Sequence, residues 1–181
     1  MLFLRHNPRG FGGLFVTSDS STLSPWQQLL LVVLRFLIGW HLFFQGFGKL
    51  QAVEWTSAGF LQGSSGPLSF FFHAIADTPL LQTLVDWITV WGLMLFGIFL
   101  MVGILSRVSA AGGFVLLMLF YLAAPALSAD GFILQTAEGT ELYVNKTLLE
   151  ALFLLVILSF PTEKIAGLDL LLVQWRKRRE P

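Results

Sequence analysis

The amino-acid sequence predicts an all-α integral membrane protein, built as a bundle of four transmembrane helices. Of its 181 residues, 55% are hydrophobic and only 12% are charged, whereas a soluble domain carries about 25% charged residues. Four apolar segments follow one another along the chain. The second of them holds Asp86 as its single charge and has no polar stripe that could face water, which argues against four buried helices of a soluble protein.

The four apolar segments cover residues 25–50, 80–105, 108–127 and 144–160. Ser24 is a suitable N-cap for the first segment, and Pro25 suits the first helical position. The first three segments exceed the roughly 20 residues that a helix needs to cross a bilayer. The fourth is short and stops at Pro161, so its outer end is expected beneath a polar vestibule. We expect a tight turn at Ser106 and Arg107 between the second and third helices.

The segments around this domain have their own patterns. Residues 1–23 form an N-terminal cytoplasmic segment, 24–160 the transmembrane domain and 161–181 a basic amphipathic C-terminal segment. The C-terminal segment is apolar on one side and ends in a run of Arg and Lys at 176–179. Such a segment is typical of an interfacial helix anchored to anionic lipid head groups.

The first external loop contains an amphipathic pattern. Leu68, Phe71, Phe72 and Ile75 are spaced i, i+3, i+4 and i+7, which predicts a helix that starts at Pro67. The favoured interpretation is a short helix lying in the outer interface of the membrane. A lid over an external opening is the alternative.

Lysine and arginine predict the orientation of the chain in the membrane. If both termini are cytoplasmic, the external side keeps only Lys49 and Lys146, and the cytoplasmic side carries the remaining basic residues of the ends and of the turn: Arg5, Arg9, Arg107, Lys164, Arg176, Lys177, Arg178 and Arg179. This asymmetry agrees with the positive-inside rule.

Composition excludes several kinds of chemistry. The chain has no cysteine, which removes disulfides, thiolate nucleophiles and iron–sulfur ligation. Its three histidines, His6, His41 and His73, form no i, i+4 pair, so we expect no intrinsic metal or haem. The net charge is zero, so no global field attracts nucleic acid.

The first apolar segment carries the polar residues that indicate a site. Arg35, His41, Gln45 and Lys49 fall within an arc of about 120° on a helix. Ionisable groups inside a membrane are costly and usually face the interior of the bundle. By helical rise, Arg35 is expected near mid-membrane.

The other three helices offer polar groups at the depth of His41 to Lys49. These groups are Asp86 on the second helix, Tyr121 on the third and Glu150 on the fourth. Helical rise therefore predicts that they converge on one pocket in the outer half of the bundle. A structural alternative stays open: Lys49 could pair with Glu150 or Asp86 merely to orient helices, and Lys146 could pair with Glu150 four residues away.

A polar pocket beneath a lipid surface suits a quinone, which needs hydrogen-bond donors, a proton relay and an apolar side for its tail. His41, Gln45, Lys49 and Tyr121 can donate hydrogen bonds. Asp86 and Glu150 can relay protons. Aromatic walls are expected from Trp40, Trp87 and Trp91.

Three motifs resemble the DoxX/DoxD type of membrane protein. The run from Arg35 through Gly39-Trp40-His41 and Gly46 to Lys49-Leu50 is similar to the first-helix signature of that family. Residues 97–107 resemble the end of its second helix, and residues 143–150 the opening of its last helix. The resemblance covers residues 25–160 and implies a four-helix protein of the bacterial cytoplasmic membrane, related to membrane subunits of thiosulfate:quinone oxidoreductase.

These observations lead to one functional hypothesis and two alternatives. The chain is expected to be a membrane subunit of a quinone-linked oxidoreductase, which passes electrons from thiosulfate or another small reductant to quinone as a diffusible substrate. It would work with a partner subunit or a second copy of itself. The first alternative is a noncatalytic subunit that anchors a respiratory complex. The second, a small transporter, is weaker, because the cytoplasmic half offers little polar lining beyond Arg35.

Overall fold

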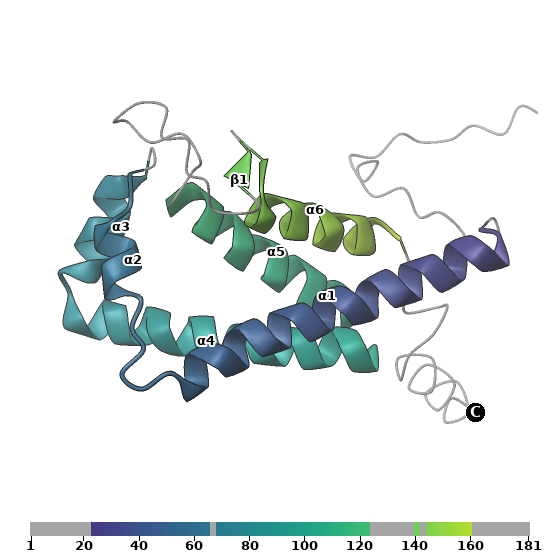
Figure 1. Cartoon of the computed structure of the whole chain (residues 1–181), viewed down its shortest axis with the longest axis horizontal. Helices are drawn as coiled ribbons and strands as arrows, with labels where there is room; N and C mark the ends of the chain where they lie inside the picture. The colour runs from purple at the N-terminus through teal and green to yellow at the C-terminus, as the bar shows by residue number, and fades with distance from the viewer. Residues whose placement is uncertain (1–22, 66–67, 124–139, 142–143, 161–181) are drawn as a thin grey trace, which may run out of the picture.

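The computed structural model describes residues 23–65, 68–123, 140–141 and 144–160, and these residues are mostly helical. Residues 1–22 of the predicted N-terminal segment and the whole predicted C-terminal segment, 161–181, lie outside the described residues. Six helices and two short strands follow in order (Figure 1): α1 Pro25–Gln51, α2 Ala58–Gln62, α3 Ser69–Ala76, α4 Pro79–Val102, α5 Ser106–Ala123, β1 Thr140–Glu141, β2 Val144–Asn145 and α6 Lys146–Ser159.

Three helices of the described part, α1, α4 and α5, are long and apolar enough to cross a membrane. The chain is therefore suited to a lipid bilayer as a multi-pass protein. Helix α6 has 14 residues, which is roughly 21 Å at the usual helical rise. That length is less than the ~30 Å hydrocarbon core, so a fourth span does not follow from the length of this helix.

Local sequence sets the two ends of the helical region. Ser24 is the N-cap of α1 and Pro25 lies in its first turn, as the sequence predicted. Gln27 completes a capping box with Ser24, which was not predicted from the sequence. The last helix starts later than predicted. Val144 and Asn145 pair as a strand with Glu141 and Thr140, and the Asn145 side chain then caps α6 by accepting a hydrogen bond from the Leu148 N–H at 2.8 Å.

The turn between α4 and α5 lies three residues before its predicted place. Gly103 has a φ of 75° and ends α4, and the N–H groups of Gly103 and Ile104 both donate to the Phe99 carbonyl. Leu105 also has a positive φ, 50°. Ser106 already belongs to α5. The prediction of a turn at Ser106 and Arg107 is wrong, because Gly103 accepts the left-handed conformation that ends a helix.

Helices α1 and α4 approach closely and run side by side (Figure 1). A Cβ atom at Gly97 would lie 2.6 Å from the Gly39 carbonyl oxygen, and one at Gly46 would lie 2.8 Å from the Val90 carbonyl oxygen. Helices in lipid associate largely through close packing, which small residues permit. These glycines therefore fix the distance between α1 and α4 along their shared length.

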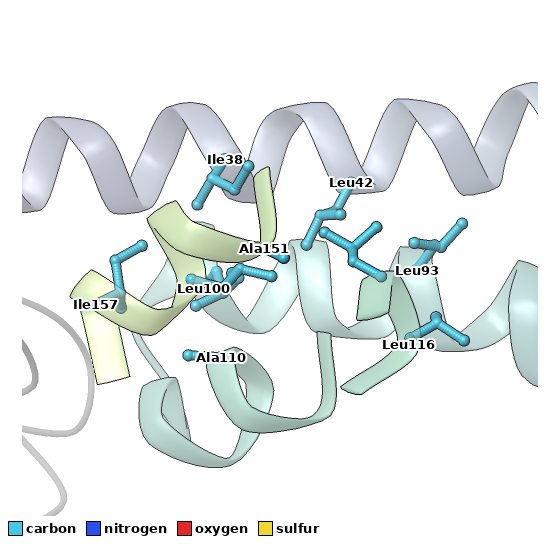
Figure 2. Close-up of a cluster of buried hydrophobic side chains, with 10 residues drawn as sticks. Ile38, Leu42, Leu93, Leu100, Ala110, Leu116, Ala151 and Ile157 are labelled. Atoms are coloured by element: carbon cyan, nitrogen blue, oxygen red, sulfur yellow. The ribbon is translucent and has the colours of Figure 1, made fainter. Parts of the chain in front are cut away.

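The core lies between α1, α4, α5 and α6. Figure 2 shows its fully or nearly buried side chains, which come from α1, α4, α5 and α6. Leu42, Leu93 and Leu154 are each 0% exposed. Large apolar side chains on the outer surfaces of the same helices stay exposed, as expected for surfaces that face lipid.

Helices α2 and α3 pack at one end of the bundle, which we call the α3 end (Figure 1). Their buried side chains Leu61, Phe72 and Ala76 contact Ala123 at the end of α5. The predicted amphipathic stripe is only partly buried, since Phe71 is 54% and Leu68 42% exposed. Pro67, its predicted start, lies outside the described residues.

Candidate functional site

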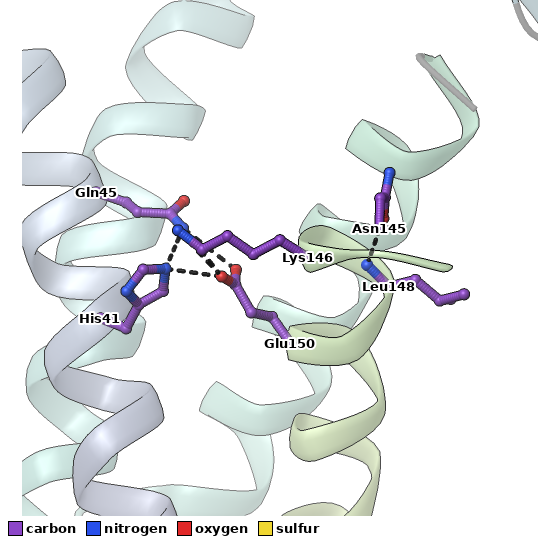
Figure 3. Close-up of polar contacts among 6 residues, drawn as sticks. All are labelled: His41, Gln45, Asn145, Lys146, Leu148 and Glu150. Atoms are coloured by element: carbon purple, nitrogen blue, oxygen red, sulfur yellow. Dashed lines mark hydrogen bonds and ion pairs between the residues drawn. The ribbon is translucent and has the colours of Figure 1, made fainter. Parts of the chain in front are cut away.

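A polar cluster joins α1 to α6 (Figure 3). His41 Nε2 lies 2.7 Å from Glu150 Oε1. Gln45 Nε2 lies 3.2 Å from Glu150 Oε2 and 2.6 Å from His41 Nε2. Lys146 Nζ lies 3.7 Å from Glu150 Oε1. We call these four residues the His–Glu cluster. Three of the seven predicted site residues, His41, Gln45 and Glu150, thus come together.

Helical spacing explains why these side chains meet. His41 and Gln45 are four residues apart on α1, and Lys146 and Glu150 are four apart on α6, so each pair shares one helix face. Between His41 and Gln45 lies Leu42, which is fully buried in the core. Ala151, next to Glu150, is also fully buried. The apolar core therefore fixes the rotation of both helices and points the polar pairs at each other.

The three ionisable groups of the cluster differ in exposure. The Glu150 side chain is 8% exposed, that of His41 is 36% exposed and that of Lys146 is 63% exposed. Lys146 begins α6 at the α3 end of the bundle. The buried carboxylate of Glu150 thus lies between a half-exposed imidazole and an exposed ammonium.

The short contact between His41 and Glu150 requires a shared hydrogen. His41 Nε2 carries either a hydrogen or a lone pair, and Glu150 Oε1 faces it at 2.7 Å. One hydrogen must lie between them, bonded to the imidazole or to the carboxyl group, because two lone pairs would repel at that distance. Such a distance is typical of a charge-assisted hydrogen bond.

Asp86 and Lys49 make other contacts. Asp86 accepts hydrogen bonds from the Ser57 N–H at 2.7 Å and the Thr56 hydroxyl at 3.0 Å, so it fastens the segment before α2 to α4. Lys49 Nζ lies 5.3 Å from the centre of the Trp55 ring, within the range of a cation–π interaction. The predicted convergence of all outer polar groups on one pocket therefore does not include these two side chains.

Arg35 and Tyr121 lie away from the ends of their helices to different degrees. Arg35 is buried, with 3% exposure, and it precedes His41 by six residues on α1, roughly 9 Å by helical rise. Tyr121 is half-buried, two residues before the end of α5.

The tryptophans predicted as pocket walls are largely exposed. Trp40 is 50% exposed and forms a row with Phe36 and Phe44. Trp87 and Trp91 stack on each other with ring centroids 6.0 Å apart and are 61% and 41% exposed. These rings present aromatic surface to the surroundings of the bundle and do not enclose the His–Glu cluster.

Sequence reasoning left Lys146 out of the site, although its spacing of four from Glu150 was the available signal. The cluster combines an imidazole–carboxylate pair, an amide donor and a cation. Within the described ranges, no group of three or more His, Cys, Asp or Glu residues could hold a metal ion.

Neither a protein-family model, nor a curated protein, nor a solved structure matches the chain.

Proposed function

We propose that the protein is the quinone-reactive membrane subunit of an oxidoreductase of the DoxX/DoxD type, which passes electrons from thiosulfate or another small reductant to quinone. The observation that carries this proposal is the contact of the buried Glu150 carboxylate with His41, between apolar helices. A protonatable pair in such surroundings is costly, and proton exchange with an amphipathic ligand accounts for its presence.

The chemistry of a quinone matches the groups at the cluster. Each carbonyl oxygen of the ring accepts a hydrogen bond and takes up one proton on reduction. His41 is half-exposed beside the buried carboxylate, so its imidazole can contact a ring that lies against α1. The exposed apolar side chains of α1 and α6, such as Phe44 and Phe153, offer a surface for an isoprenoid tail.

The proposed setting is the bacterial cytoplasmic membrane, with four spans and both termini inside. Helix α6 serves as the fourth span, and its short length leaves Lys146 beneath the outer surface of the bilayer. The α3 end then faces outwards. The reductant is oxidised on a partner subunit or on a second copy of the chain, which delivers its electrons to the quinone.

A noncatalytic role as an anchoring subunit is the second candidate. It is favoured by the fact that both Glu150 oxygens already contact groups of the chain itself, His41 and Lys146 at Oε1 and Gln45 at Oε2. A bridge of this kind orients α1 against α6 even without a ligand. Replacement of such a pair by apolar residues is often neutral for stability, which separates the two candidates.

Quinone retention distinguishes the two roles. We expect gently purified wild-type protein to retain quinone, measured by mass spectrometry of the extracted lipids per mole of folded protein. The double variant His41→Leu/Glu150→Leu should stay folded but lose the quinone. Asp77→Asn, which removes an exposed carboxylate elsewhere, is the matched control and should retain it. Equal retention by wild type and double variant would reject the site and leave the anchoring role.

A further inference from the structure

We propose that Glu150 Oε1 is the atom through which protons from the outer aqueous side reach the quinone, with Lys146 positioning the carboxylate and His41 passing the proton on. This proposal rests on the quinone function proposed above and adds the route and the direction of proton supply. It follows from one geometric fact: the same carboxylate oxygen contacts both His41 Nε2, at 2.7 Å, and Lys146 Nζ, at 3.7 Å.

The place of the cluster in the proposed topology gives the route its direction. Lys146 begins α6 and there lies nearer to the outer aqueous side than Glu150, whose side chain is almost buried. Water is therefore expected to reach the carboxylate from the side of Lys146. On the opposite side of Glu150, the core begins directly at Ala151 and Leu154, which are both fully buried, and apolar side chains do not conduct protons towards the other end of α6.

His41 has a second nitrogen for the next transfer. Its Nε2 faces Glu150 and Gln45. When the shared hydrogen is bonded to Glu150 Oε1, the Nε2 lone pair accepts it and the imidazole carries its own hydrogen on Nδ1. Nδ1 and Nε2 lie on different edges of the ring. An imidazole that accepts a proton at Nε2 can release the hydrogen at Nδ1 to a quinone oxygen. Gln45 donates to Glu150 Oε2 at 3.2 Å and is thus a positioning residue for the carboxyl group.

The proton and electron balance closes with the proposed reductant. One quinone takes two electrons and two protons to become quinol. Two thiosulfate ions supply the electrons, as each loses one and a new S–S bond joins them. The first proton forms an O–H bond on the quinone as it leaves His41 Nδ1, while Nε2 accepts a proton from Glu150 Oε1. The imidazole then returns to the tautomer with its hydrogen on Nδ1 by losing the Nε2 hydrogen to water and taking one from water at Nδ1, and the second proton follows the same route. Water beside Lys146 then returns a proton to the carboxylate.

Lys146 contributes by position and charge. Lys146 precedes Glu150 by one helical turn, and its ammonium, 3.7 Å from Oε1, holds the carboxylate oxygen towards the aqueous side. Arginine at this place keeps the charge, and methionine keeps only the apolar stem. Lys146→Met should therefore slow proton supply by about tenfold, since water still reaches the carboxylate and a general acid–base contribution is only partly lost. Lys146→Arg should keep most of the rate.

The test uses full-length protein in phosphatidylethanolamine–phosphatidylglycerol vesicles with ubiquinone-1. An electrode and a mediator supply the electrons, so no partner is required. The exposed Gln62 at the α3 end is replaced, Gln62→Cys, and biotinylated, and vesicles that bind streptavidin are collected. A pH indicator placed outside or sealed inside then shows which compartment loses protons, and a separate titration gives the quinone Kd of each variant.

We expect proton uptake from the compartment that Gln62 faces, a roughly tenfold slower rate in Lys146→Met, and an unchanged quinone Kd. Glu150→Gln, which keeps the shape of the side chain, should bind quinone and supply no protons by this route. The control Glu54→Gln, another exposed charge at this end, should match wild type. Uptake from the opposite compartment, or a wild-type rate in Lys146→Met, overturns this route while leaving the quinone site intact. A wild type that binds no quinone rejects the proposed function, and this proposal with it.

Discussion

At the scale of single residues, the polar side chains of α1 share one helix face but differ in how far they are buried. Arg35 is 3% exposed, while His41 is half-exposed and Lys49 lies beside Trp55. The guanidinium and the carboxylate of Glu150 are thus the two strongly buried charges among the described residues. Each removes a charged group from solvent, which costs several kcal/mol unless its partners compensate.

Arg35 is expected to be required for assembly or activity and not for insertion into the membrane. Arg35→Leu removes a buried charge without adding bulk, so the amount of protein in the membrane fraction should stay close to wild type while quinone retention or assembly is lost. Arg35→Lys should not restore it, because an ammonium lacks the planar fork of the guanidinium. Wild-type behaviour of Arg35→Leu in both measurements would show that the residue is incidental.

Asp86 is expected to hold the segment before α2 in place. Asp86→Ala removes the acceptor of the Ser57 N–H and of the Thr56 hydroxyl. A hydrogen bond to a charged group contributes about 1.5 kcal/mol or more, so hydrogen exchange at the Ser57 amide should speed up by roughly tenfold. Asp77→Asn is the control, and an unchanged exchange rate in Asp86→Ala would contradict this role.

At the scale of helices, the local signals predicted more than the long-range ones. Ser24 and Pro25 predicted the start of α1 from neighbouring residues alone, and this start is confirmed. The end of α4 was misplaced, because Gly103 and Leu105 both adopt positive φ values, which a hydropathy pattern does not reveal. The start of α6 was misplaced as well, because two residues of the apolar segment pair as a strand with the chain before them.

The candidate site shows the same division. Helical rise gives the depth of a residue, and depth correctly brought Glu150 to the level of His41 and Gln45. It does not give the rotation of one helix against another, which depends on packing. Asp86 therefore turns to the Ser57 amide and Lys49 to the Trp55 ring, although both were predicted to join the cluster.

The contact between α1 and α4 should depend on Gly97. A Cβ atom there would lie 2.6 Å from backbone atoms of α1, so Gly97→Ala forces the helices apart and should destabilise the fold by about 1–3 kcal/mol. Gly48→Ala is the matched control, because a Cβ at Gly48 meets nothing within 4 Å, and it should leave the melting temperature unchanged or slightly raised. Similar melting temperatures for both variants would show that the contact is looser than described.

At the scale of the whole molecule, the orientation in the membrane stays a prediction from the basic residues. It predicts that the α3 end faces outwards and the turn between α4 and α5 faces the cytoplasm. The chain has no cysteine, so single introduced thiols report without background. Gln62→Cys should react with an impermeant reagent in intact cells, and Arg107→Cys only after lysis. A cysteine introduced at Ser64, in the same loop, would be a poor reporter, because Ser64 is buried and its hydroxyl donates to the Ala123 carbonyl. The reverse labelling pattern would invert the topology.

The hydrogen bonds that join Asp86 to the segment before α2 have a consequence for the order of events during biosynthesis. Asp86 lies inside the long apolar helix α4, yet its partners, Thr56 and Ser57, belong to chain made about 30 residues earlier. In the proposed topology these partners must already have crossed the membrane when α4 enters it. The carboxylate would otherwise travel into lipid with no hydrogen-bond donor. Translocation of the first loop thus brings the donors Thr56 and Ser57 into position before α4 inserts. This order favours insertion of α4 after the loop has crossed, and not before.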